Sequence, residues 1–476
     1  MTQRSAPTGA LFRDRRLGAP YKWGMRPLTT SLTIAGALLL GACTSASRAP
    51  AAMSRVHAAP ASAPCPQGIP AGTRCYSGQD SAGAFYWVAI PAEWNQVLVM
   101  HAHGGPELDA PTLARATEDL QRWAVTVKAG YAWAGSTYRR GGYGVTMAAE
   151  DTERLRAWFV QNFGAPRRTV LHGQSYGAGV AAKAAELYAQ VDGRKGPYDG
   201  VLLTSGVLGG GTQAYDYRLD LRVVYQFICQ NHPLPTEPAY PLWQGLPRDS
   251  TLGRAELARR IDDCTGIRKP AAERTALQRA NLQAILATVK IPERSLVGNM
   301  NWSTFLFRDL VQERLDGGNP FGNIGANYSG SHDDTRLNAE VLRYRADPAA
   351  VARLAADSDP TGRVEVPTLT LHAIDDPTAF VELESAYRAV RERAGTADLL
   401  VQTFSHESEH SYLSDAEYPA LFAALLDWID HGQKPTPADI AARCKSFEAG
   451  FGVGCHIDPA YQPRPLSARV PNRQRP

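Results

Sequence analysis

The stretch Arg168-Thr-Val-Leu-His-Gly-Gln-Ser175-Tyr-Gly-Ala-Gly-Val180 decides the fold, because in it an apolar strand passes through Gly-x-Ser-x-Gly into an Ala-rich helix. A serine on such a tight turn holds its hydroxyl clear of the sheet, and the flanking Gly173 and Gly177 let strand and helix approach without Cβ clashes. The amides and dipole of the following helix favour negative charge that develops beside the serine. The pattern predicts a nucleophile at Ser175. A glycine-rich turn with a capping serine is the alternative.

Short apolar runs rich in β-branched residues alternate with helical stretches along most of the chain. Helices are expected at 148–163 and 178–188. Strands are expected at 85–90, 97–100, 131–136, 169–172, 201–204, 368–371 and 399–404. This alternation indicates an α/β fold in which a mostly parallel sheet carries helices on both faces.

The alternation of strand-like runs with helical stretches stops in the segment 207–363. That segment has helical patterning over 251–263 and 271–289, and many aromatic residues, but little sign of strands. We therefore expect a catalytic domain built from 65–206 and 364–476, with 207–363 inserted as a mainly helical lid. Aromatic side chains in such a lid suit a bulky or aromatic substrate, although at helical spacing most such residues pack in a core.

The strand, turn and helix around Ser175 resemble those of the α/β-hydrolase superfamily. This resemblance implies an oxyanion loop after an earlier strand, and His103-Gly104-Gly105-Pro106 matches the His-Gly-Gly loops of many esterases and of proline-specific peptidases. Because Pro106 has no N–H, Gly105 is the expected donor to an oxyanion, together with the Tyr176 amide.

The same resemblance implies an acid after a later strand and then a histidine, in the order Ser, Asp, His. The run 366–377 ends in Asp-Asp-Pro, where Asp376 occupies the family's position for the acid and Asp375 is the alternative. Either aspartate is also suited to capping the next helix. In the loop 404–412, His410 is nearer the final helix and is the expected base, with His406 as the alternative.

These residues together predict a serine hydrolase that works through an acyl-enzyme intermediate. The resemblance favours a carboxylesterase that acts on small or polymer-derived esters, with aromatic esters among the candidates. A prolyl-type peptidase is the alternative, since Gly-x-Ser-Tyr-Gly with His-Gly-Gly-Pro also fits that group. The third reading is a surface binding protein built on an inactive hydrolase scaffold.

No metal or organic cofactor is expected from these motifs. The loop 316–334 is rich in Asp and Asn. Lids of tannase-like esterases bind calcium in such loops, but no spacing of ligands is recognisable here, so a solvated loop is the expectation.

The amino terminus resembles a bacterial lipoprotein signal. Basic residues precede the apolar run Leu32–Leu40, which leads into Leu-Gly-Ala-Cys43. This resemblance implies that 1–42 is a signal peptide and that Cys43 becomes a lipid-modified first residue. A flexible tether would follow over 43–64, and the protein would be anchored to a bacterial membrane at the periplasmic face or the outer membrane. An ordinary cleaved signal is the alternative, and Met25 is a second possible start.

The composition of the 476 residues, with 44% hydrophobic and 20% charged residues, is that of a globular chain rather than a disordered or collagenous one. The formal charge of +3 gives no basic footprint for nucleic acid. Residues 1–42 hold six Lys or Arg against one Asp, so their removal would change that charge to −2. The oligomeric state is left open by the sequence.

Seven cysteines are present, and setting aside Cys43 leaves an even set. Pairing in sequence order is the simplest arrangement in an oxidising compartment. Metal binding is the competing interpretation, but the chain has no Cys-x-x-Cys. The expected disulfides are Cys65–Cys75, Cys229–Cys264 and Cys444–Cys455.

Overall fold

The computed structural model describes residues 60–411 and 413–476. The expected signal peptide, Cys43 and the first part of the expected tether lie outside the described residues. No helix within the described ranges is long and apolar enough to cross a membrane.

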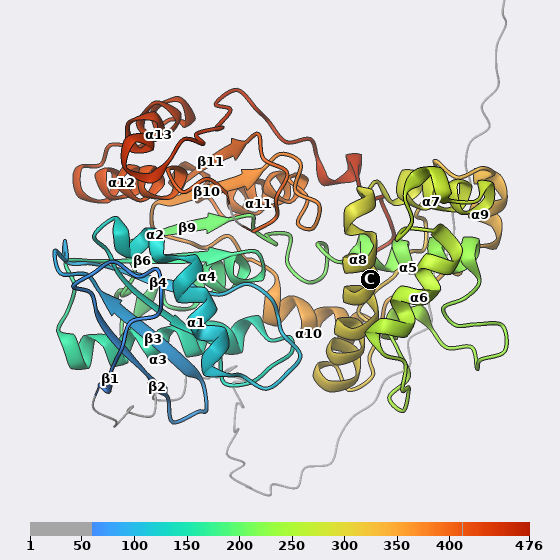
Figure 1. The fold of residues 1–476 in the computed structure, drawn as a ribbon, viewed down its shortest axis with the longest axis horizontal. Coiled ribbons are helices and arrows are strands. Elements are labelled where there is room, and N and C mark those ends of the chain that lie inside the picture. Colours follow the sequence, from blue (N-terminus) through green and yellow to red (C-terminus); the bar gives the residue numbers. More distant parts are fainter. Residues whose placement is uncertain (1–59, 412) are drawn as a thin grey trace, which may run out of the picture. The chain divides into compact units, whose positions relative to one another are not determined.

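Nine strands form one sheet in the order β1-β2-β3-β5-β4-β6-β9-β10-β11 (Figure 1). The strands are β1 (Ser62–Ala63), β2 (Arg74–Gln79), β3 (Phe85–Ile90), β4 (Val97–Ala102), β5 (Ala132–Ser136), β6 (Arg168–Gln174), β9 (Gly200–Thr204), β10 (Thr368–Ala373) and β11 (Leu400–Ser405). From β5 to β11 every neighbouring pair is parallel, whereas β1, β2 and β3 pair antiparallel. A separate hairpin joins β7 (Gln190–Val191) to β8 (Arg194–Lys195). The mostly parallel sheet predicted from the sequence is confirmed, and each expected strand lies in it.

The sheet begins earlier in the chain than we expected. Ser62 and Ala63, at the end of the segment assigned to a tether, pair with Tyr76 and Cys75 of β2. The disulfide between Cys65 and Cys75 explains this pairing, because it holds the neighbouring backbone beside β2. The expectation of a tether up to residue 64 is therefore wrong for these last residues.

Helices cover both faces of the sheet, and the side chains of β4 show why. Leu98 and Met100 join one buried cluster, while Val97 and Val99 join the other. Because successive side chains of a strand point to opposite faces, each face receives an apolar layer. The first face is covered by α3 (Val145–Phe163), α4 (Tyr176–Leu187) and α11 (Glu382–Arg393), and the second by α1 (Leu113–Arg122), α2 (Ala124–Lys128) and α12 (Glu417–His431), on which α13 (Pro437–Phe451) packs.

The segment between β9 and β10 is helical throughout its regular structure. It contains α5 (Asp216–Cys229), α6 (Arg254–Thr265), α7 (Ala276–Val289), α8 (Leu296–Asn301), α9 (Asp334–Glu340) and α10 (Pro348–Ser358), with π-helical turns at Trp302–Leu306 and Asp309–Arg314. We call residues 207–363 the insertion. Its side chains Leu219 and Ile285 belong to the same buried cluster as Leu98 of the sheet. The insertion is thus continuous with the core on the α3 and α4 face.

Cross-links hold the ends of several elements together. All the expected disulfides are present: Cys65–Cys75, Cys229–Cys264 and Cys444–Cys455. The second of them joins the end of α5 to α6 inside the insertion.

A strap of residues 469–475 crosses back onto the insertion and onto α11. The Arg469 guanidinium pairs with Glu382 at 2.9 Å. Further along, Arg473 pairs with Asp220 at 2.6 Å and Arg475 with Asp216 at 2.5 Å. Helix α5 is therefore held by charges from the far end of the described chain.

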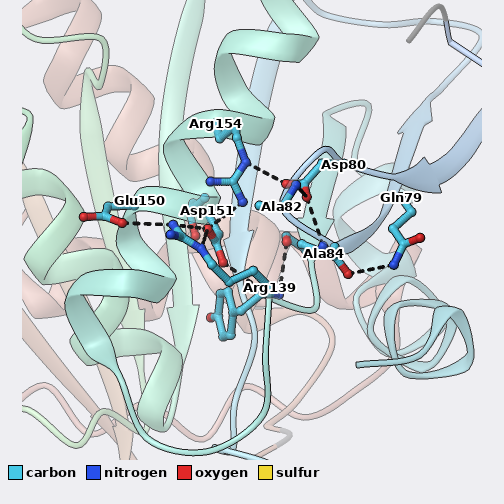
Figure 2. Close-up of polar contacts among 12 residues, drawn as sticks. Gln79, Asp80, Ala82, Ala84, Arg139, Glu150, Asp151 and Arg154 are labelled. Carbon is cyan, nitrogen blue, oxygen red and sulfur yellow. Dashed lines mark hydrogen bonds and ion pairs between the residues drawn. The ribbon is translucent and has the colours of Figure 1, made fainter. Parts of the chain in front are cut away.

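A buried ion network fixes the loop that follows β5 (Figure 2). The Asp151 carboxylate of α3 accepts hydrogen bonds from Arg139 Nε and from Arg154, each at 2.6 Å. The Arg154 Nε atom also donates to Asp80 in the β2–β3 turn at 2.7 Å. Because Asp151 is fully buried, this pairing offsets the cost of burying its charge.

The close approach of backbone at the β6–α4 turn requires two glycines. A Cβ atom on Gly173 would lie far inside van der Waals contact of the Gly177 carbonyl oxygen, and one on Gly177 would meet the Ala102 carbonyl oxygen in the same way. Between them, Ser175 has φ 57°, a conformation that is strained for a residue with a side chain. This turn, with the sheet order and the loops after β10 and β11, gives the chain the α/β-hydrolase fold.

We expect Gly177→Ala to lower the free energy of unfolding by about 3 kcal/mol, because the new methyl group must push apart backbone atoms rather than a flexible side chain. The matched control is Gly179→Ala in the same helix, where a Cβ meets only the Val207 carbonyl oxygen at 3.7 Å. That change should leave stability equal or raise it by about 0.5–1 kcal/mol. Denaturant unfolding measures both variants, and equal effects would contradict the packing argument.

Candidate functional site

Ser175 lies at the tip of the turn between β6 and α4. Its backbone N–H donates to the Thr204 carbonyl at 3.0 Å, and its own carbonyl accepts from Ala178 and Val207, each at 3.1 Å. These bonds hold the positive φ in place. The residue is 8% exposed, so its hydroxyl is set in a largely dry environment.

His410 reaches Ser175 from the loop between β11 and α12. The distance from Ser175 Oγ to His410 Nε2 is 2.7 Å. On the other side of the ring, Nδ1 lies 2.8 Å and 3.0 Å from the two carboxylate oxygens of Asp376. Because a carboxylate can only accept, Nδ1 carries the proton, and Nε2 is left to accept from the serine hydroxyl.

Asp376 is held in the loop after β10 by backbone donors. Its Oδ1 atom accepts from the N–H groups of Thr378 at 2.8 Å and Ala379 at 2.9 Å. Burial alone would raise the pKa of this carboxyl group, but His410 and His372 outweigh it, and the pKa lies below its ordinary value. Asp376 therefore stays ionised beside the imidazole ring.

The two alternative residues from the sequence lie apart from this set. His406 is exposed, and its Nε2 atom lies 3.1 Å from Asp458 Oδ2. The Asp375 backbone N–H donates to Glu407, and its carbonyl accepts from Arg294. The structure thus brings together Ser175, His410 and Asp376, and it does not bring His406 or the Asp375 carboxylate into hydrogen-bonding contact with them.

The expected oxyanion donors flank the turn. Tyr176 is the first residue of α4, and Gly105 follows β4 in the His103–Pro106 loop. Within residues 60–411 and 413–476, neither backbone N–H donates a hydrogen bond to another backbone group. Both are therefore free of backbone partners in the described structure, as donors to a reacting oxygen must be.

The loop with Gly105 is supported from two sides. The His103 ring stacks on Tyr138 at 4.2 Å between centroids, and the Tyr138 hydroxyl donates to the His103 carbonyl. Burial lowers the pKa of His103 to about 4, so its ring is neutral at physiological pH. On the other side, Gln174 lies so close to Gly104 of this loop that a Cβ there would meet the Gln174 Oε1 atom. The Gln174 Nε2 atom donates to Ser411 Oγ at 3.1 Å, which links the end of β6 to the loop with His410.

His372 is a site residue that the sequence did not reveal. It is fully buried in β10, with Nε2 2.8 Å from the Ala379 carbonyl and 3.5 Å from Asp376, and Nδ1 3.2 Å from Glu384. Burial would lower its pKa, but hydrogen bonds to Asp376 and Glu384 dominate and raise the pKa to about 10. Because both ring nitrogens face acceptor oxygens, the ring is an imidazolium between two carboxylates. The sequence signal that could have revealed His372 is a histidine placed within an otherwise apolar strand.

No cluster of three or more His, Cys, Asp or Glu side chains suited to a metal ion occurs in the described part of the chain. In the loop 316–334, Asp316 pairs with Arg353, and Asp334 accepts from the Ser331 backbone. These aspartates thus bind groups of the protein itself.

Comparison with known proteins gives likenesses in structure only. No protein-family model and no curated protein sequence matches the chain. The structure is similar to feruloyl esterase B from Aspergillus oryzae, with a TM-score of 0.40 and 13% identity over 80% of this chain and 88% of that one. It is also similar to the rice cell wall degrading esterase LipA from Xanthomonas oryzae (TM-score 0.34, 14% identity, 79% of this chain and 90% of that one). A third likeness is to a puromycin hydrolase (TM-score 0.36, 13% identity, 75% of this chain and 39% of that one).

The charge on His372 predicts a specific dependence of stability on pH. Its folded-state pKa of about 10 exceeds the ordinary value of 6.5, so the bound proton stabilises the folded protein. This stabilisation is complete below about pH 6.5 and is lost as the pH rises towards 10. The difference in free energy of unfolding between wild type and His372→Gln should therefore be largest near pH 6 and shrink steadily up to pH 10.

His172 in β6 provides a control with the opposite sign. Burial lowers its pKa to about 3, so its contribution is complete above about pH 6.5 and is lost as the pH falls. Denaturant unfolding of wild type, His372→Gln and His172→Gln across pH 4–10 measures both effects. If the free energy of unfolding of wild type exceeds that of His372→Gln by the same amount at every pH between 6 and 10, His372 is neutral in the folded protein.

Proposed function

We propose that this chain is a serine hydrolase that cleaves carboxylic esters through an acyl-enzyme intermediate. The observation that carries the proposal is the continuous hydrogen-bonded line from Ser175 Oγ through His410 to Asp376, at 2.7 Å and 2.8 Å. This line ends on a serine held at the tip of a strained turn, where a substrate carbonyl is able to approach.

Each residue then has a defined part in the reaction. His410 Nε2 takes the hydroxyl proton as Ser175 Oγ attacks the ester carbonyl, and the ionised Asp376 stabilises the imidazolium that forms. The proton passes from His410 to the leaving alcohol, which breaks the ester bond and leaves an acyl group on Ser175. Water, activated by His410, releases the acid and restores the serine.

Negative charge on the carbonyl oxygen is met by the Tyr176 and Gly105 amides. These donors are fixed before the reaction, so they need no reorganisation as charge develops. The helix dipole of α4 acts in the same direction at Tyr176.

Esters are favoured over peptides with a free amino terminus, because recognition of an ammonium group needs a carboxylate that is not already paired. The buried carboxylates around the site are already paired, since Asp376 and Glu384 both contact His372, and Asp216 and Asp220 of α5 pair with the strap. The aromatic side chains of the insertion beside the site favour a bulky or aromatic ester.

We infer that the protein is exported and anchored by lipid at Cys43. The Leu-Gly-Ala-Cys43 sequence after an apolar run supports this location, and three disulfides are typical of an oxidising compartment. In a bacterial host, Cys43→Ala should abolish incorporation of labelled palmitate and release the protein from the membrane fraction. Equal labelling of the variant would contradict this anchor.

Replacing the proposed nucleophile or base should remove the activity. Ser175→Ala and His410→Gln are each expected to lower kcat for p-nitrophenyl butyrate by at least about 10⁴-fold, since these residues act as a unit. His406→Gln is the matched control and should stay within about twofold of wild type, because its ring contacts Asp458 instead. A fluorophosphonate probe should label wild type and the His406 variant but not Ser175→Ala.

A second substrate separates ester from peptide cleavage. Turnover of proline p-nitroanilide that exceeds turnover of the butyrate ester would identify a peptidase. Labelling of Ser175→Ala at the wild-type level would show that the nucleophile lies elsewhere.

A further inference from the structure

A buried arginine in the insertion has rings around it and no polar partner among the described residues. Arg218 lies in the first turns of α5 and is 3% exposed. Its guanidinium carbon lies 4.0 Å from the ring centroid of Trp302, 4.8 Å from that of Tyr217 and 5.1 Å from that of Tyr215. The guanidinium therefore stacks on aromatic faces, and its N–H groups do not donate to these rings.

Within residues 60–411 and 413–476, no hydrogen bond or ion pair satisfies the guanidinium of Arg218, and its Nε atom is fully buried without a partner. Arg222, one turn later, is equally buried, but it donates to Gly245, Ser303 and Thr304. The buried side chain of Arg260 is likewise paired, with Glu237. Arg222 has no carboxylate partner and its Nε is also unsatisfied, but its Nη1 is bound, whereas no group in the described structure accepts a hydrogen bond from any part of the Arg218 guanidinium.

The carboxylates of the same helix do not serve Arg218. Asp216 pairs with Arg475 at 2.5 Å, and Asp220 pairs with Arg473 at 2.6 Å. A buried cation without a partner is costly, and stacking on rings offsets only part of that cost. The strap thus takes the local acids and leaves Arg218 without a carboxylate among the described residues.

Two short series of contacts connect this charge to the catalytic line. The Tyr215 ring lies 5.8 Å from the ring of Tyr143, which lies 5.5 Å from that of Tyr176, the residue after Ser175. On the other side, the Tyr217 hydroxyl donates to the Thr378 carbonyl at 2.9 Å, and the Thr378 N–H holds Asp376. The rings that stack on Arg218 are thus linked through intervening residues to Tyr176, which follows the nucleophile, and to the acid Asp376.

A turn of unusual geometry presents Trp302 to the arginine. Residues Trp302–Leu306 are π-helical, a rare form that is often found at functional sites. Trp302 is only partly buried, unlike the Tyr215 and Tyr217 rings on the same arginine.

We propose that Arg218 binds a carboxylate carried by the substrate, so that the preferred esters have a free acid group on an apolar or aromatic body. This inference rests on the proposed esterase function. A guanidinium presents parallel N–H groups that match the two oxygens of a carboxylate, and it does so along the edge that stacking leaves open. The surrounding rings would contact the apolar body of the same substrate.

Matched pairs of esters test the selectivity. Mono-p-nitrophenyl adipate is compared with p-nitrophenyl hexanoate for a carboxylate on the acyl side, and 4-carboxyphenyl butyrate with phenyl butyrate for one on the alcohol side. In one of these pairs the wild type should prefer the charged ester in kcat/KM. Arg218→Met should lower that preference at least about tenfold, mainly through KM, and Arg218→Lys should fall between them.

Arg254→Met is the control variant, because Arg254 is an exposed arginine that also stacks on an aromatic ring of the insertion, that of Phe305. It should leave the preference unchanged. An equal loss of kcat/KM for charged and neutral esters in Arg218→Met would make Arg218 a packing residue and overturn the proposal. So would a wild type that prefers the neutral ester of both pairs.

Binding without turnover separates this proposal from the proposed function. In Ser175→Ala, adipate or benzoate should raise Tm, and the rise should shrink when Arg218→Lys is added and vanish when Arg218→Met is added. Carboxylates that stabilise the protein while no ester is hydrolysed would reject the esterase and keep the anion site. If esters are hydrolysed but carboxylates do not raise Tm, the esterase function is kept and the anion site is rejected. A rise in Tm with inorganic phosphate but not with carboxylates would also overturn the proposal.

Discussion

The contact of three backbone segments without side chains between them is the constraint on which the site depends. At Gly173, Gly177 and Ala102, strand β6, helix α4 and strand β4 come so close that no Cβ fits at either glycine. This closeness sets the turn so tightly that Ser175 takes a positive φ, and it places the start of α4 beside the end of β4. The nucleophile and its two expected amide donors therefore share one rigid frame, which the parallel sheet supplies.

The charged side chains around this frame are buried, so their stability depends on how they are paired. Asp376 and Glu384 hold the imidazolium of His372 between them, so the carboxylate that faces His410 is itself anchored by a cation on its far side. In a dry interior such pairing keeps Asp376 ionised, whereas burial without partners would neutralise it. Arg218 is the contrasting case, a buried charge whose complement is missing from the described protein. The interior of the described chain thus contains a carboxylate whose charge is paired, at Asp376, and a guanidinium whose charge is not, at Arg218.

Much of this site was predictable from the sequence because its signals are local. The period of apolar residues marked the strands, and Gly-x-Ser-x-Gly marked the turn. The position that the resembled family uses for its acid favoured Asp376 over Asp375, and nearness to the final helix favoured His410 over His406. The structure brings together Ser175, His410 and Asp376. Strand β2 was missed because it is only partly buried and lacks a clear apolar alternation.

The residues that the sequence did not reveal act through distant partners. The His372 ring is held by a hydrogen bond with Glu384, which lies on a helix. The Gln174 side chain donates to Ser411, more than 200 residues later in the chain. Arg218 stands out only once Asp216 and Asp220 are seen to be occupied by the strap. No pattern within a window of sequence carries such information, since it arises from what the fold brings together.

The strap also has a consequence for the order in which the molecule is completed. Helix α5 is made early, yet its buried carboxylates Asp216 and Asp220 find their cations only at Arg475 and Arg473, about 250 residues later. A growing chain that has not reached Arg473 holds two acids whose burial is costly, so the aromatic cluster around Arg218 should pack late. Synthesis from the amino end would thereby leave this part of the insertion unpacked until almost the whole described chain has emerged.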